Sequence, residues 1–199
     1  MSRCLTMILL FTACATGAPI VPLLPKAQEQ PVITLVWVGR GEAELFEDGS
    51  WRRTPAFDYE FTVEQRRFAT HWESVKQLRR RHPGYDGSAG PREQTMFFRI
   101  DYALGEGNQV TSKVTSTLGE GTGHADLEFR TARLTMRPEV SRFAPFDTYR
   151  IDQTYRYEEG ALEEEVALLN GDRPWVRNHE QATLFAPHQF AEAPTRLMR

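Results

Sequence analysis

The feature that most constrains the fold is a period of two in the apolar residues. In the stretch 149–157, mostly large side chains occupy the odd positions and polar side chains occupy the even ones. Successive side chains of a strand point to opposite faces, so this pattern gives one face to a core and the other to water. Similar alternation recurs in 57–63, 96–102 and 110–114. The chain is therefore predicted to fold mainly into β-strands.

Turn-forming residues separate these runs at the spacing of hairpins. They occur at 48–49, 105–108, 119–123, 159–160 and 170–171. Such residues supply the backbone conformations that tight hairpins need. We therefore expect a single antiparallel meander of about eight or nine strands that forms a barrel or a strongly curved sheet. The glycine-rich stretch 119–123 is predicted to be a turn and not a phosphate-binding loop, because no helix follows it.

One segment departs from the period of two. Its apolar residues are Trp72, Val75 and Leu78. This spacing of three predicts one helix near 70–81, preceded by a strand that ends at about Arg66. Thr70 and Glu73 have the spacing of a capping box, and the Pro-Gly pair at 83–84 would end the helix.

The predicted helix carries a basic cluster and leads into a long loop. The cluster consists of Lys76, Arg79, Arg80, Arg81 and His82. Guanidinium groups suit phosphate and carboxylate, but such a charge run is also typical of a solvated helix face. The loop 82–95 is rich in glycine and proline, and is either a binding lip or a plain surface connection. Asp86 and Ser88 lack the regular acidic spacing of a calcium loop, so no metal site is expected there.

Aromatic residues are frequent enough to fill or line the interior of a curved sheet. They form either a packed core or the wall of an apolar cavity. If a ligand binds, the helix and the following loop would cover the cavity, and arginines would meet an acidic head group. The predicted ligand-binding residues are Trp72, Arg79, Arg80, Tyr85 and Tyr102.

No catalytic or metal-binding motif is evident in the sequence. The histidines, at 71, 82, 124, 179 and 188, show no metal-ligand spacing. The acidic run 163–165 is either an acid and base pair or, as we expect, part of an exposed hairpin in which Glu164 points away from its neighbours. Ser88 does not lie in a nucleophile elbow. No cofactor is predicted, and an enzyme is the least favoured interpretation.

The N-terminal segment has the layout of an export signal. Arg3 gives a positive start, 5–11 is a short apolar core, and Thr12 and Ala13 are small residues before Cys14. The apolar core is too short to span a bilayer. The segment resembles the signal peptide of bacterial lipoproteins, in which the cysteine that closes the box is acylated and becomes the mature N-terminus. Here the box is Phe11-Thr12-Ala13-Cys14, with Phe11 in place of the usual Leu, Val or Ile.

The resemblance implies a lipid-anchored protein of the bacterial envelope. Ala15, which follows the cysteine, favours the outer membrane under the proteobacterial sorting rule, with the domain facing the periplasm. The alternative is ordinary secretion, with cleavage near Cys14 and a soluble product. Cys4 and Cys14 both lie in the signal segment, so no internal disulfide is expected.

The chain is expected to divide into four parts. They are a signal peptide (1–13), the lipidated Cys14 with a proline-rich tether (14–31), a β-rich globular domain (32–186) and a C-terminal tail (187–199). The net charge of −3 argues against a nucleic-acid partner.

The expected architecture favours binding over catalysis. In strand count and lone helix, the domain resembles lipocalin-like and lipoprotein-receptor-like folds, which is an analogy of fold alone. The favoured function is a binding module for an apolar or amphiphilic ligand. The alternative is a structural or assembly lipoprotein that contacts envelope proteins, for which we would expect an exposed apolar patch.

Overall fold

The structure is a computed structural model, and it describes residues 30–88, 90–138 and 146–185. The predicted signal peptide, Cys14, most of the tether and the C-terminal tail lie outside the described residues. Their assignments therefore remain predictions.

The described residues form eleven strands. In chain order these are β1 (Ile33–Glu47), β2 (Ser50–Arg53), β3 (Tyr59–Arg67), β4 (His71–Arg79), β5 (Glu93–Leu104), β6 (Gln109–Ser116), β7 (Gly119–Asp126), β8 (Thr131–Arg137), β9 (Thr148–Arg156), β10 (Ala161–Asn170) and β11 (Arg173–Leu184). Three single turns of 3-10 helix lie between strands, namely η1 (Pro55–Phe57), η2 (Glu106–Asn108) and η3 (Tyr157–Glu159).

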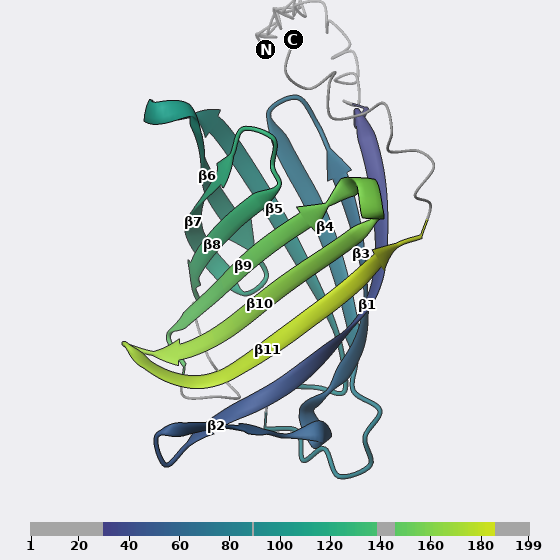
Figure 1. Cartoon of the computed structure of the whole chain (residues 1–199), viewed down its shortest axis with the longest axis vertical. Coiled ribbons are helices and arrows are strands. Elements are labelled where there is room, and N and C mark those ends of the chain that lie inside the picture. Colours follow the sequence, from purple (N-terminus) through teal and green to yellow (C-terminus); the bar gives the residue numbers. More distant parts are fainter. Residues whose placement is uncertain (1–29, 89, 139–145, 186–199) are drawn as a thin grey trace, which may run out of the picture.

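Strand β1 closes the sheet into a barrel. It pairs antiparallel with β11 along one edge and with β3 along the other. From β3 to β11, each strand pairs with its neighbours in the chain, so that ten strands form a closed barrel and β2 is an outer strand on the end of β1. Figure 1 shows these strands wrapping obliquely around the molecule, with β2 at the bottom. The expected mainly β barrel is confirmed, with more strands than the turn signals predicted.

The barrel has two ends, which we name as they lie in Figure 1. The upper end carries the β3–β4 turn, the β7–β8 turn (127–130) and η3. The lower end carries β2, η1 and the loop 80–92 between β4 and β5. The described chain enters the barrel through β1 and leaves it through β11 at the upper end. Whatever precedes the barrel in the chain is therefore attached at that end.

The period of two in the sequence becomes the division between the interior and the outer wall. In β3, the side chains of Tyr59, Phe61, Val63, Gln65 and Arg67 are buried, and the residues between them are exposed or half-buried. One buried cluster fills the interior and draws members from every strand except β2 and β7. The core of the protein is therefore the inside of the barrel.

The prediction of a helix near 70–81 is wrong, because this segment forms strand β4. Ser74 and Lys76 occupy inward positions of β4, and Val75 lies between them on the outer face. These two polar residues hide the alternation of a strand, and the remaining apolar residues fall three apart by coincidence. Within the described residues, no helix has the length and apolar character needed to cross a membrane.

The prediction of a turn at 119–123 is also wrong, because these residues begin strand β7. A side chain at Gly121 would collide with the carbonyl oxygen of Thr135 on the neighbouring strand β8. Glycine is needed here because the two backbones approach too closely for a Cβ atom. The glycines of β7 thus allow the sheet to curl tightly and close around its core.

Candidate functional site

The structure places the five predicted ligand-binding residues in three different regions. Trp72 and Tyr102 lie at the upper end, with ring centroids 6.4 Å apart. Arg80 and Tyr85 lie at the lower end, with the guanidinium carbon 5.0 Å from the ring centroid. Arg79 lies on the outer wall and pairs with Glu93 at 2.7 Å. A single site cannot include all five.

Side chains fill the middle of the barrel. Trp37, Val114 and Met136 each have 0% of their surface exposed. A side chain that bordered a water-sized void would expose some of its surface to that void. No such void lies against these three residues, so the core is packed around them.

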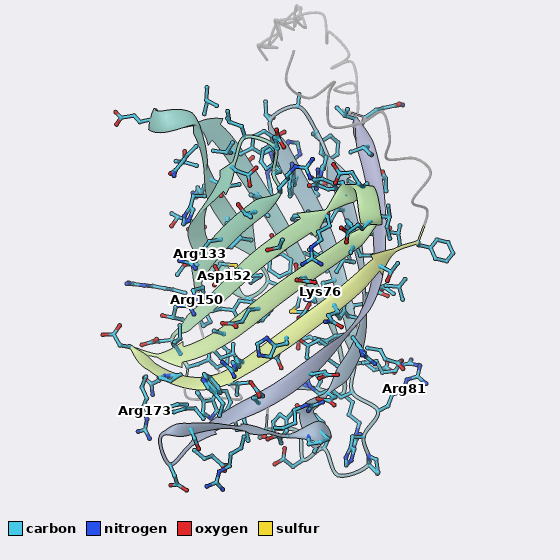
Figure 2. The ribbon with its side chains drawn as sticks, in the orientation of Figure 1. Lys76, Arg81, Arg133, Arg150, Asp152 and Arg173 are labelled. Atoms are coloured by element: carbon cyan, nitrogen blue, oxygen red, sulfur yellow. The ribbon has the colours of Figure 1, made fainter. Side chains whose placement is uncertain are left out.

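A buried ionic cluster interrupts this apolar core. The Lys76 ammonium group donates hydrogen bonds to Glu180 and, at 3.2 Å, to Glu164. The Tyr59 hydroxyl donates to the second oxygen of Glu180, and Gln153 donates to Glu164. Figure 2 shows Lys76 within the outline of the barrel, behind the strands of the front wall. The cluster joins strands β3, β4, β9, β10 and β11 across the interior.

The charges within the cluster set its protonation. Burial alone would lower the pKa of Lys76, but the carboxylates of Glu180 and Glu164 raise it above its usual range. Burial raises the pKa of Glu180 to about 8, and the Glu164 carboxylate adds to this rise while Lys76 opposes it. Burial also opposes ionisation of Glu164, but Lys76 holds the pKa of that carboxyl below its ordinary value. These pKa shifts favour a cluster of one ammonium, one carboxylate and one protonated carboxyl group.

A carboxyl group that titrates near neutral pH is a candidate general acid or base. Catalysis would require contact between this group and a substrate. The exposed fractions of Lys76, Glu164 and Glu180 are 6%, 7% and 2%, and packed side chains surround them. The burial of these three residues therefore fits a structural role in the core better than contact with a substrate.

The upper end of the barrel contains an arginine in an aromatic cage. The guanidinium carbon of Arg67 lies 4.0 Å from the ring centroid of Trp72, 5.6 Å from that of Tyr155 and 5.2 Å from that of Tyr157. Its Nη2 donates a hydrogen bond to the Tyr157 hydroxyl at 2.7 Å. The period of two in β3, β4 and β9 points these side chains into the same end of the lumen.

Phe129, from the β7–β8 turn, covers this cage. Its ring centroid lies 4.9 Å from that of Trp72 and 5.3 Å from that of Tyr102. Phe129 has a φ of 53°, a left-handed conformation that residues other than glycine rarely adopt. Its carbonyl oxygen accepts a hydrogen bond from the Tyr157 hydroxyl at 2.9 Å. The ring of Phe129 thus plugs the upper end of the barrel.

Asp126 holds the turn that carries Phe129. One of its carboxylate oxygens accepts hydrogen bonds from the backbone N–H groups of Glu128 and Arg130, and the other accepts from Thr131. These hydrogen bonds outweigh the effect of burial and lower the pKa of Asp126. Arg130 also makes two hydrogen bonds to Glu158 in η3. The plug is therefore anchored by polar contacts along the rim.

The lower end carries a loop with its own arginine. Arg80 donates from Nη1 to the Pro91 carbonyl at 2.9 Å and lies 5.6 Å from the ring centroid of Tyr59. The Tyr85 hydroxyl donates to the Gly90 carbonyl at 2.7 Å. Both hydrogen bonds lie within the loop 80–92, and the contacts of Arg80 with Tyr59 and of Tyr85 with Phe57 attach its described residues to the lower end of the barrel.

A groove of about 1090 Å³ crosses the outer wall over β5, β4, β3, β1, β11 and β10. A row of small or neutral residues in register forms its floor: Ala161, Thr183, Val38, Thr62, Gln77 and Thr95. Charged residues at its rim are paired, with Arg79 next to Glu93 and Arg81 at 2.7 Å from Glu60. Figure 2 shows Arg81 projecting from the lower part of the wall, away from the lumen.

Beside this groove lies a row of half-buried and exposed apolar residues, which we call the outer apolar row. Val36, Val75 and Phe97 lie in register across β1, β4 and β5, with Glu64 between the two valines. The backbone N–H of Phe185 donates to the carbonyl of Val36. Phe97 is 53% exposed and Phe185 is 77% exposed.

Other polar residues make ion pairs along the outer wall and show no metal-binding arrangement. Arg133 and Arg150 both contact Asp152, and Figure 2 shows these three close together on β8 and β9. His179 lies between Glu44 and Glu165, at 3.4 Å and 3.8 Å. Among the described residues, no group of three or more His, Cys, Asp or Glu side chains is placed to hold a metal ion.

The charged residues that define both interior sites are not among the predicted site residues. Arg67 continues the alternation Tyr59, Phe61, Val63, Gln65 on β3. Glu164 lies inside β10, where we had expected an exposed hairpin, and it does point away from Glu163 and Glu165. Lys76 belongs to the basic cluster that the sequence leaves open between an anion-binding site and a solvated face, and it is buried. A charged residue in phase with buried neighbours was the signal that could have identified all three.

Comparisons with known proteins assign no family to the chain. No family model matches it, and no curated protein matches it. One similar solved structure comes from Thermobifida fusca and is provisionally described as a thioesterase II. The identity is 9%, the match covers 73% of this chain and 78% of the other, and the TM-score is 0.21. A likeness at this level carries no information about activity.

Proposed function

We propose that the protein is a lipid-anchored binding module of the bacterial envelope that takes an apolar or amphiphilic ligand at the upper end of its barrel. The observation that carries this proposal is the insertion of Phe129 among Trp72, Tyr102 and the other aromatic residues of the cage. The ring occupies the place that an apolar group of a ligand would take. Displacement of a single turn would open this end, whereas the core around Trp37, Val114 and Met136 is packed.

The free energy needed to displace the Phe129 ring sets a lower limit on the apolar area of the ligand. An aromatic ring buries about 150–250 Å² when it is fully enclosed, which corresponds to roughly 4–6 kcal/mol at about 25 cal/mol per Å². Phe129 is only half-buried, and its left-handed backbone adds a strain of about 1–2 kcal/mol. A ligand that displaces the ring must therefore bury an apolar area comparable to one ring or a short alkyl chain.

The position of the chain's entrance supports a membrane-associated role. The backbone N–H of Val32 donates to the carbonyl of Arg67 at 2.7 Å, so the chain that leads to Cys14 joins the barrel beside the aromatic cage. With Cys14 acylated, the ligand site would lie at the anchored end of the domain. An amphiphile that leaves the outer membrane would reach this end first.

Native mass spectrometry of the barrel domain (residues 30–185), in the presence of dodecanol, tests the binding proposal. We expect the wild-type domain to bind one molecule and the Phe129→Ala variant to bind it more tightly, because the ligand no longer has to displace the ring. The matched control is Phe185→Ala, which removes an exposed phenylalanine from the outer wall. Failure of the wild type and of Phe129→Ala to bind any amphiphile would contradict the proposal.

The outer apolar row supports a second candidate function, in which the protein is an assembly lipoprotein that contacts an envelope protein. Apolar side chains that lie together on the outer surface of a protein are typical of protein contact sites. Cross-linking in envelope membranes distinguishes this function from ligand binding. If the protein is an assembly lipoprotein, we expect a stoichiometric protein partner to be cross-linked to the wild type and to be lost in a Phe97→Ser variant. Recovery of the wild type without a cross-linked partner would exclude this function.

A further inference from the structure

Among the described residues, Arg67 is a buried cation without an acidic partner. Its side chain is 4% exposed, and its Nε atom is buried without a hydrogen-bond partner. Within the described residues, no carboxylate oxygen lies within the 4.0 Å of an ion pair from its guanidinium group. Its hydrogen bond to Tyr157 and its contact with Trp72 offset only part of the cost of burying a charge.

Comparison with Arg177 shows what Arg67 lacks. Arg177 also stacks on a tryptophan, with its guanidinium carbon 4.4 Å from the ring centroid of Trp51. Arg177 is in addition hydrogen-bonded to the carboxylate of Glu44. Arg67 also contacts a tryptophan, Trp72, but pairs with no carboxylate among the described residues. The acidic partner that Arg177 has is therefore missing from the described surroundings of Arg67.

We infer that Arg67 is the receptor for an acidic head group, a carboxylate or a phosphate monoester, on an amphiphilic ligand. This inference rests on the proposed function and specifies the ligand class. Guanidinium groups bind such anions through charge-assisted hydrogen bonds, and the free Nε–H supplies one donor. The apolar part of the ligand would replace Phe129, and the anion would lie against Arg67 beneath it.

Tyr157 links the anion to the plug. It accepts a hydrogen bond from Arg67 and donates its own proton to the carbonyl of Phe129. An anion beside Arg67 can accept the hydroxyl proton of Tyr157 in place of that carbonyl. Binding of the head group would then remove one of the hydrogen bonds that hold the turn of Phe129, so arrival of the anion and opening of the plug favour each other.

Arg80 is the competing candidate, since its Nε is also buried without a hydrogen-bond partner. Its Nη1, however, is bonded to the carbonyl of Pro91 in the loop at the lower end. Its neighbour Tyr59 is bonded to Glu180. The surroundings of Arg80 are therefore those of a fastened loop, and the test includes this residue to separate the two assignments.

Isothermal titration of the barrel domain with dodecanoate, dodecyl phosphate and dodecanol tests the inference. These probes share one alkyl chain and differ in the head group, and acetate and inorganic phosphate report any binding of the anion alone. We expect the wild type to bind the two acidic amphiphiles about 10- to 100-fold more tightly than dodecanol, the ratio expected for one hydrogen-bonded charge. In Arg67→Gln this ratio falls to about one, while affinity for dodecanol is retained.

The control and competing variants make the assignment specific. Arg177→Gln should keep the preference for acids, because that arginine lies outside the lumen. If Arg67→Gln is too unstable to fold, Arg67→Lys serves as the second variant. It should keep part of the preference for acids, since the charge remains but the planar donor set is lost. Equal binding of acid and alcohol by the wild type would overturn the inference and leave the proposed function intact. Loss of the preference in Arg80→Gln but not in Arg67→Gln would move the receptor to the lower end and also overturn it. Failure of the wild type to bind any of the three amphiphiles would overturn the proposed function itself.

Discussion

At the scale of single residues, the interior is defined by a few charged side chains among apolar ones. Lys76, Glu164, Glu180 and Arg67 all lie on the inward face of their strands. The sequence shows that each is in phase with apolar neighbours, but it does not show which strands meet across the lumen. The partnership of Glu164 with Glu180 depends on the register between β10 and β11, so no local pattern could have predicted it.

The protonation of Glu180 makes stability dependent on pH. The carboxyl group titrates at about 8 in the folded protein and near its ordinary value of 4.5 when unfolded. Its contribution to stability is therefore complete below 4.5 and is lost as the pH rises to about 8. The groups that face it are Lys76, Glu164 and Tyr59, and its charge contributes to the raised pKa of the nearby Tyr149.

Urea unfolding of the wild type and of Glu180→Gln, across mildly acidic to mildly alkaline pH, measures this effect. We expect the free energy of unfolding of the wild type to fall with rising pH in this window, and that of Glu180→Gln to fall much less, because glutamine does not titrate. Glu164, with its lowered pKa, acts in the opposite sense and loses its contribution as the pH falls through its folded value. Equal slopes for the two proteins would show that Glu180 does not hold the proton.

Removal of the lysine should be costly. Lys76→Met leaves the Glu164 carboxylate buried without its cation, and we expect a loss of about 3–5 kcal/mol in the free energy of unfolding. The matched control is Lys113→Met on the exposed face of β6, with a change within about 0.5 kcal/mol. Adding Glu164→Gln to Lys76→Met should recover part of the loss, and the absence of any recovery would argue against direct coupling.

At the scale of elements, the sequence predicted most strands and failed where polar or small residues face the core. Strands β3, β5, β6 and β9 were predicted because their inward residues are mostly apolar. Strand β4 was mistaken for a helix because Ser74 and Lys76 face inward, and β7 was mistaken for a turn because glycines do. In both cases tertiary contacts, the ionic cluster and the close approach of β8, decide the local structure and override the local pattern.

The tight packing of β7 against β8 predicts the effect of a single methyl group. Gly121→Ala places a Cβ against the carbonyl of Thr135, so the strands must separate locally. We expect a loss of about 1–3 kcal/mol in the free energy of unfolding, as measured by urea denaturation. Gly84→Ala is the control, because its added Cβ meets only the ring of His82 in the exposed loop. An equally small effect for both variants would contradict the close approach.

At the scale of the whole molecule, two features bear on function: the sheet closes into a barrel, and the described chain enters the barrel at its upper end. A closed barrel has no long exposed sheet edges, so association through added strands is disfavoured. The described chain begins at the upper end, where the aromatic cage and Arg67 lie. The fold thus joins the proposed anchor and the proposed ligand site at one end, a connection that the sequence could not show without the path of β1.

The anchor itself is open to a direct biochemical test. We expect the full chain, expressed in a proteobacterial host, to incorporate a radioactive fatty acid and to fractionate with the outer membrane. Cys14→Ala removes the acceptor thiol and should abolish the label, whereas Cys4→Ala should not. Label retained in Cys14→Ala, or a wild type found only as soluble protein, would favour ordinary secretion.

In the proposed function, an amphiphile binds at the upper end of the barrel and its apolar part takes the place of Phe129. Titration of the isotopically labelled domain with dodecanoate, followed by backbone amide NMR, tests this claim most directly. If the ligand takes the place of Phe129, we expect the largest chemical-shift changes at residues 67–72, 102, 126–131 and 155–157. Changes along β10 and in the loop 80–92 should be small. Changes centred on the outer groove, or no changes at saturating dodecanoate, would contradict it.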